Sequence, residues 1–179
     1  LAELVPINES LRVLDLACGS GLLLKILFDR NKNLNLKGID MCSEELGLAK
    51  SRLKNSGVDL VRSKAQDLTS INDNSIDIVL CHWALTLMDP IAPVLNEVRR
   101  VLTSKGRFAA LVDGPMNAAP GYADVHNLIY SYAQEEIPNY GDIDLGDSRI
   151  RGRQSLSNLA HETFPDANIS IDTNVVTIE

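Results

Sequence analysis

The sequence predicts an α/β fold in which a doubly wound, mostly parallel sheet carries helices on both faces. Short β-like apolar runs alternate with helical patterns along the chain, and a turn of small residues joins the first apolar run directly to a helix. At 179 residues, with 45% hydrophobic and 23% charged residues, the chain has the length and composition of one globular domain. We therefore expect a single domain over residues 1–179.

The predicted elements follow one another as five β/α steps. Strands are predicted at Leu11–Leu16, Leu34–Asp40, Val58–Arg62, Ile76–His82 and Gly106–Val112. Helices are predicted at Leu22–Arg30, at Ser43–Asn55, which would begin with a serine N-cap, and at Ile91–Leu102, where apolar residues recur at helical spacing. In an open sheet of this kind a ligand binds outside the carboxyl ends of the strands, near the switch in strand order beside the first strand.

The segment 114–148 interrupts the alternation. Prolines and glycines surround one helical stretch at Ala123–Glu136, so we expect an insertion or lid over the carboxyl edge of the sheet. A helix at Ser155–Thr163 and a strand at Ala167–Ile178 are predicted to follow.

Charge and cysteine content exclude several classes of protein. The formal net charge is −7, and the stretch from Phe108 to Ser148 holds seven acids and no Lys or Arg, which would repel a nucleic acid. The sequence shows no apolar run near the ~20 residues of a membrane span, and it does not open like a signal peptide. Its three cysteines form no C-x-x-C pair, which argues against a disulfide framework and a zinc site. We therefore expect a cytoplasmic protein without a metal, a nucleic-acid partner or a membrane partner.

The turn after the first strand reads Asp15-Leu16-Ala17-Cys18-Gly19-Ser20-Gly21. Such a turn lets a ligand approach the main chain and the N–H groups at the start of a helix, although a tight turn without a ligand is the alternative. A dinucleotide site would need a third glycine, and Leu24 stands at that position. Asp15 is unfavourable beside a diphosphate but suits the charged amino end of a zwitterionic ligand. The turn therefore favours a nucleoside that carries an amino acid.

The second strand ends at Asp40, which lies 21 residues after Gly19 (40 − 19). An acid at this place and spacing accepts hydrogen bonds from both ribose hydroxyls. The alternative is an acid that only favours the N-terminus of the following helix. The two motifs together favour the ribose role.

Five motifs in this order resemble those of a known family. They are Asp15-Leu16-Ala17-Cys18-Gly19-Ser20-Gly21, Gly38-Ile39-Asp40-Met41-x-Ser43, Ala65-Gln66-Asp67-Leu68, Asn74-Ser75-Ile76-Asp77-Ile78-Val79 and Leu95-Asn96-Glu97-Val98-Arg99-Arg100-Val101-Leu102. Over about Leu11 to Val112 the chain is similar to class I S-adenosylmethionine-dependent methyltransferases, in the small-molecule group that includes the malonyl-acyl-carrier-protein enzymes. The resemblance implies a Rossmann-like fold and transfer of a methyl group from S-adenosylmethionine to a small-molecule or carrier-bound acceptor. The other hypothesis is a non-catalytic binding module that acts through a partner chain.

The resemblance also implies roles for particular residues. The cofactor-binding candidates are Asp15, Ala17, Gly19 and Gly21 for the methionine part, Asp40 for the ribose, Met41 for the adenine face, and Ala65 with Gln66 for the adenine edge. The position before Ala65 is usually acidic in the family, but here it is Lys64, so Asp67 becomes the candidate acceptor for the adenine amino group. Cys81, a small residue near the loop, completes the set. The family sheet has seven strands, and we expect this chain to lack the last one.

Methyl transfer needs alignment of donor and acceptor more than a reactive group of the protein. His82, at the end of the fourth predicted strand, is the candidate general base, and a packed histidine is the alternative. Trp83 is expected in the core or in a pocket wall. Tyr122, His126 and Tyr130 are the candidate acceptor-binding residues, unless they belong to a surface helix whose tyrosines pack on the sheet. The sequence after the fourth strand lacks the Asn/Asp-Pro-Pro-aromatic loop of the enzymes that methylate adenine or glutamine amides.

Overall fold

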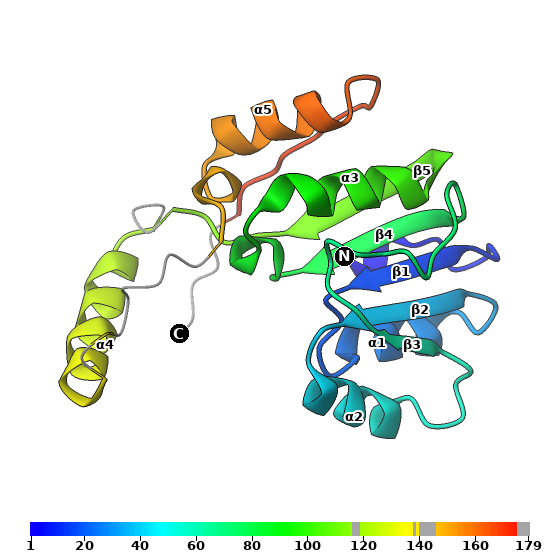
Figure 1. The fold of residues 1–179 in the computed structure, drawn as a ribbon, viewed down its shortest axis with the longest axis horizontal. Helices are drawn as coiled ribbons and strands as arrows, with labels where there is room; N and C mark the ends of the chain where they lie inside the picture. Colours follow the sequence, from blue (N-terminus) through cyan, green and yellow to red (C-terminus); the bar gives the residue numbers. More distant parts are fainter. Residues whose placement is uncertain (116–118, 138, 140–145, 175–179) are drawn as a thin grey trace. The chain divides into compact units, whose positions relative to one another are not determined.

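A computed structural model describes residues 1–115, 119–137, 139 and 146–174, and its centre is a five-stranded parallel sheet (Figure 1). The strands are β1 Arg12–Leu16, β2 Asn35–Asp40, β3 Asp59–Arg62, β4 Ile76–His82 and β5 Leu102–Leu111, in the order β3-β2-β1-β4-β5. The strand order therefore reverses beside β1. The predicted doubly wound parallel sheet is confirmed.

Three helices cover the sheet. They are α1 Leu22–Arg30, α2 Ser43–Arg52 and α3 Ile91–Val101, with short 3₁₀ turns at Ala2–Leu4 (η1) and Leu85–Leu87 (η2). Because parallel crossovers are right-handed, α1 and α2 cover one face and α3 covers the other. Leu24 and Leu27 of α1 pack with Val13 of β1 on the first face, and the apolar stripe of α3 is fully buried on the second.

The chain divides into two compact units. The first comprises residues 1–85 and 90–112, and it holds the whole sheet; the second comprises residues 86–89 and 113–179. In the second unit, α4 spans Tyr122–Glu136, η3 spans Ser148–Ile150 and α5 spans Arg153–Thr163. The expected place of segment 114–148 over the sheet stays a prediction. Across the described ranges, no helix has the length and apolar character needed to cross a membrane.

Three local predictions are wrong. Residues 167–174, the described part of the strand predicted at Ala167–Ile178, form no strand, because the five-stranded sheet does not include them and an alternating pattern forms a strand only where a neighbouring backbone pairs with it. Ser43 is the first residue of α2 and not its N-cap, since Asp40 accepts the N–H of Cys42 before it. β5 begins at Leu102 and not at Gly106, because the predicted turn is an irregularity inside the strand, between the pairs Ile76–Leu102 and Ile78–Arg107.

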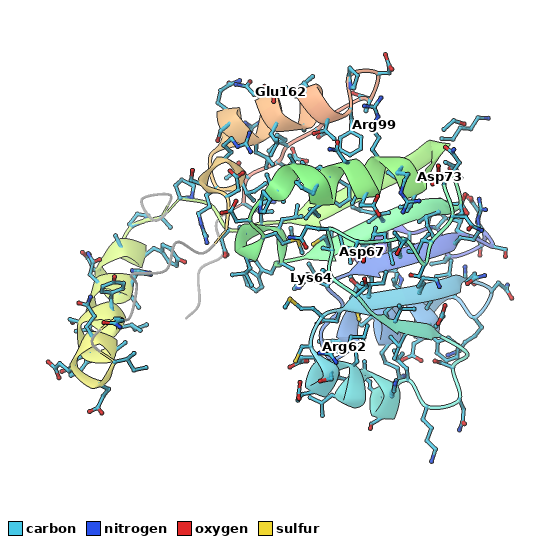
Figure 2. All side chains as sticks on the ribbon, in the orientation of Figure 1. Arg62, Lys64, Asp67, Asp73, Arg99 and Glu162 are labelled. Carbon is cyan, nitrogen blue, oxygen red and sulfur yellow. The ribbon has the colours of Figure 1, made fainter. Side chains whose placement is uncertain are left out.

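An arginine ties the connection between β3 and β4 to α3. The Arg100 guanidinium donates to Glu97 at 2.7 Å, to the carbonyl oxygens of Leu68 and Ile71 at 2.9 and 3.0 Å, and to Asp73 at 2.5 Å. Figure 2 labels Asp73 and, earlier on the same connection, Lys64 and Asp67. Arg100 therefore holds the part of the connection that leads into β4, while its first residues, after β3, lie at the carboxyl edge of the sheet.

Candidate functional site

The turn between β1 and α1 is built from residues in the left-handed region. Ala17, Gly19 and Gly21 have φ of +57°, +50° and +73°. The Cys18 N–H donates to the Ile39 carbonyl at 2.9 Å, which fixes the turn to β2. No side chain caps the start of α1, so its first N–H groups are available to a ligand. A Cβ at Gly19 would meet only a Glu45 oxygen, at 3.7 Å, so the backbone there is open to a close approach.

Asp15 is a buried carboxyl group at the end of β1. Its register partners are Gly38 of β2 and Leu80 of β4, and it is 1% exposed. Its Oδ2 atom has no hydrogen-bond partner. Burial, and then the charge of Asp40, raise the pKa of Asp15 from 3.8 to about 7. A buried carboxylate that lacks a partner is stabilised by a cation, so this position suits the positive group of a ligand.

Asp40 joins the end of β2 to the turn. Its two carboxylate oxygens accept the N–H groups of Gly19 at 2.8 Å and Cys42 at 2.9 Å. Each carboxylate oxygen has two lone pairs, so both oxygens can still accept a hydroxyl group. The structure therefore brings the glycine turn and Asp40 together.

The ends of β2 and β3 lie beside Asp40. Met41 is 63% exposed, and its carbonyl accepts a hydrogen bond from Arg62 Nε at 3.1 Å. The Ser63 N–H donates to the Asp40 carbonyl at 3.1 Å, so the turn that holds Lys64, Ala65 and Gln66 starts at the Asp40 backbone.

Asp67 closes this turn. Its N–H donates to the Lys64 carbonyl at 3.0 Å, and its carboxylate accepts the Thr69 hydroxyl at 2.8 Å. The hydrogen bonds from Thr69 lower the pKa of Asp67. Asp67 thus has a structural role in the turn, and its contact with an adenine amino group stays a prediction.

The end of β4 brings a thiol and two rings to the same edge. Cys81 is buried, and its burial and the neighbouring Asp15 raise the pKa of its thiol to about 12, so it stays protonated. His82 is exposed, and its ring centroid lies 5.6 Å from that of Trp83 in an edge-to-face arrangement. Trp83 is 55% exposed, so the expectation of a core residue is wrong. His82 is likewise not a packed histidine.

The three acceptor candidates lie on α4 in the second unit. His126 and Tyr130 stack with their centroids 5.9 Å apart, and Tyr122 is exposed. No residue of α4 is buried, so its tyrosines do not pack into a core. Their contact with an acceptor stays a prediction.

Sequence reasoning missed the part that α2 plays. Arg52 donates to the Ser20 hydroxyl at 2.6 Å, and a Cβ at Gly21 would lie 3.0 Å from the Ala49 Cβ. Glu45, Ala49 and Arg52 share one face of α2 by their spacing of three and four residues, and this spacing was the available signal. Within the described ranges, no group of three or more His, Cys, Asp or Glu residues could hold a metal ion.

These residues fit an amino-acid-bearing nucleoside. The unpartnered Asp15 oxygen suits an ammonium group, the open Gly19 backbone allows a close approach, and Asp40 keeps acceptor capacity for a ribose.

The family and the curated relatives that match this chain are methyltransferases. The family described as "Methyltransferase domain" matches residues 14–110, which is more than half of the chain. A demethylmenaquinone methyltransferase of Thermotoga maritima is 29% identical over 147 residues, covering 82% of this chain and 62% of that protein. A malonyl-[acyl-carrier protein] O-methyltransferase of Coxiella burnetii is 31% identical over 91 residues, covering 49% of this chain and 36% of that protein.

A solved structure shares the fold. The Bacillus protein YcgJ superposes with a TM-score of 0.66 at 18% identity, covering 90% of this chain and 64% of that protein. This chain spans less than two thirds of these relatives' lengths. The matched segment contains the glycine turn, Asp40 and the end of β4. The chain therefore belongs to the family of class I S-adenosylmethionine-dependent methyltransferase domains.

Proposed function

We propose that this chain binds S-adenosylmethionine at the carboxyl edge of its sheet and transfers the methyl group to a small-molecule or carrier-bound acceptor in the cytoplasm. The observation that carries the proposal is the unpartnered, buried Oδ2 of Asp15, four residues before the open backbone of Gly19. A ligand with an ammonium group supplies the missing partner. A nucleic acid and a membrane surface are not expected partners.

Each candidate residue has a distinct task in this proposal. Asp15 accepts the ammonium group, and the backbone from Ala17 to Gly21 holds the methionine part. Asp40 accepts the ribose hydroxyls with the lone pairs that the backbone N–H groups leave open. The remaining contacts are Met41 on the adenine face, Ala65, Gln66 and Asp67 at the adenine edge, and Cys81 near the loop.

The protein's main contribution to the reaction is alignment and exclusion of water. The bound cofactor supplies a methyl carbon on a positively charged sulfur. The acceptor attacks this carbon directly, so the transfer needs no nucleophile from the protein. His82, exposed at the end of β4, accepts a proton when the acceptor is a hydroxyl group. Tyr122, His126 and Tyr130 supply aromatic contacts to the acceptor.

Isothermal titration tests the donor site directly. The chain should bind S-adenosylmethionine and its demethylated product with micromolar affinity, and NADH should give no heat of binding. Asp40→Asn should abolish or greatly weaken this binding, while Asp59→Asn, which changes an exposed carboxylate on β3, should not. A folded sample that binds neither donor nor product would contradict the proposal. Binding without turnover on any acceptor would instead favour a binding module that acts through a partner chain.

A further inference from the structure

The surroundings of Asp15 do not favour a negative charge on its carboxyl group. The side chain is 1% exposed, and among the described residues its Oδ2 has no hydrogen-bond partner. The charge that acts on it comes from another acid, Asp40, at the end of β2. A buried carboxylate with neither a cation nor a donor for this oxygen is costly, so Asp15 retains its proton at a pH where an ordinary aspartate has lost it.

Two buried thiols next to Asp15 supply no cation. Cys81 comes from β4 and Cys18 from the turn, and both are buried. Burial, and then the charge of Asp15, raise the pKa of each thiol to about 12. Both thiols therefore stay neutral between pH 6 and pH 8.

The charged side chains of the helices on this face of the sheet are engaged elsewhere or are negative. In α2, Arg52 donates to the Ser20 hydroxyl at 2.6 Å, and Glu45 places another acid beside the turn. In α1, Lys25 pairs with Asp29 of the same helix. The cation that would stabilise an ionised Asp15 must therefore come with a ligand.

A ligand with an ammonium group favours the ionised form of Asp15. The ammonium group and the carboxylate compensate each other, whereas an ammonium group beside a protonated carboxyl adds a buried charge without a partner. Binding of the cation and loss of the proton are therefore linked.

We propose that the donor site exchanges a proton for the ammonium group of its ligand: Asp15 holds a proton when no ligand is bound, and binding displaces that proton. This exchange rests on the proposed binding of S-adenosylmethionine and describes how pH regulates the same site. The O–H bond of the carboxyl group breaks, the proton passes to water or to a buffer base, and the carboxylate pairs with the ammonium group. A lower pH thus weakens the binding of both the donor and its demethylated product.

The pKa of Asp15 sets the pH range of this effect. Burial, and then the charge of Asp40, raise that pKa to about 7. A ligand that requires the ionised form loses about tenfold in affinity for each pH unit well below the pKa, and almost nothing above it. From pH 8 to pH 6 the affinity should therefore fall about tenfold.

The test is a calorimetric titration of the whole chain with the demethylated product at pH 6, 7 and 8. The product keeps the ammonium group of the donor, which stays protonated over this range, and it lacks the charge on sulfur. Its dissociation constant should rise about tenfold from pH 8 to pH 6. At pH 6 the heat of binding should vary with the ionisation enthalpy of the buffer as expected for release of about one proton.

Three variants assign the effect to a residue. Asp15→Asn should bind the product with the same affinity at pH 6 and pH 8, within twofold, and without release of a proton. Asp59→Asn, at an exposed carboxylate on β3, should keep the tenfold dependence. His82→Gln should keep it as well, because the exposed imidazole at the end of β4 titrates near neutral pH but does not hold the exchanged proton.

A second ligand tests the role of the ammonium group without any variant. 5′-Methylthioadenosine has the nucleoside and the sulfur but no ammonium group, so its affinity should not fall from pH 8 to pH 6. This comparison decides the matter if Asp15→Asn does not fold.

Four outcomes would overturn the inference: product affinity that is equal within twofold at pH 6 and pH 8, a tenfold dependence that persists in Asp15→Asn, loss of the dependence in His82→Gln, or a tenfold fall for 5′-methylthioadenosine. Each of these leaves the proposed binding of the donor intact. Absence of binding at every pH, in a folded sample, would overturn the proposed function together with the exchange.

Discussion

Replacing Asp15 by Asn should stabilise the unliganded protein at pH 8 and weaken its binding of S-adenosylmethionine. Asp15 is 1% exposed, and its Oδ2 has no partner. Burial, and then the charge of Asp40, raise its pKa from 3.8 to about 7. The folded protein therefore resists ionisation of this group, whereas the unfolded chain ionises it readily.

The sign of the pH dependence follows from the raised pKa. Below pH 3.8 the Asp15 carboxyl is protonated in both the folded and the unfolded state, so its ionisation does not change the free energy of unfolding. As the pH rises from 3.8 to about 7, the unfolded state loses the proton first, so the free energy of unfolding falls. Above about 7 both states are ionised and the loss is complete. The rise in pKa, at about 1.4 kcal/mol for each pH unit, corresponds to a loss of about 4 kcal/mol.

The Asp15→Asn variant carries no charge at this position at any of these pH values. The new amide group can cost about 1–3 kcal/mol if it is left unpaired, but that cost does not depend on pH. The difference in unfolding free energy between the variant and the original protein therefore isolates the ionisation of Asp15. From pH 5 to pH 8 this difference should move by about 2.5 kcal/mol in favour of the variant.

Urea unfolding at pH 5, 6, 7 and 8 measures this difference. Asp166→Asn, at an exposed carboxylate, serves as the control and should give a difference that does not change with pH. At pH 8 the Asp15→Asn variant should also bind S-adenosylmethionine at least tenfold more weakly by titration calorimetry. A difference in stability that is the same at pH 5 and pH 8, within about 0.5 kcal/mol, would refute the reasoning.

Four further substitutions test the geometry of the first unit. Asp40→Asn should weaken S-adenosylmethionine binding at least tenfold in calorimetry while the thermal unfolding midpoint falls by only a few degrees, and unchanged affinity would remove Asp40 from the site. Gly21→Ala should lower the unfolding free energy by about 1–2 kcal/mol, because φ is +73° there, whereas Gly47→Ala in α2, where a Cβ meets no atom, should raise it by up to about 1 kcal/mol. Arg100→Met should lower it by about 2–3 kcal/mol in urea unfolding, because it leaves Glu97 with only the Leu68 N–H as donor and removes the donor of two carbonyl groups, and a loss below about 0.5 kcal/mol would contradict that account.

The regular elements were predictable because their cause is local in sequence. The limits of β4 match the prediction, Ile76–His82, since a continuous apolar run between polar residues has few other folds. The limits of α1, Leu22–Arg30, match as well. The glycine turn and Asp40 were predictable for the same reason, since a strand, a turn and an acid about 20 residues later occur within one β/α/β unit.

Other features depend on tertiary contacts that spacing does not encode. The start of β5 at Leu102 depends on how β4 pairs around an irregularity, and the sequence around Gly106 resembles an ordinary turn. The left-handed conformation of Trp83 depends on its hydrogen bond to Leu111 in another strand. Asp15 could be recognised as a candidate ligand, but its unpartnered oxygen depends on what surrounds it after folding.

The two ends of the sheet differ in how their charged groups are paired. At the amino end, the guanidinium of Arg12 pairs with both oxygens of Asp77, at 2.7 and 2.9 Å, so each charge has a partner. At the carboxyl end, the buried carboxyl group of Asp15 has an oxygen without a partner. An unpartnered buried carboxylate opposes stability, and a ligand that supplies a cation would offset this cost. The proposed binding of a cationic ligand therefore compensates a charge that folding leaves buried at this edge.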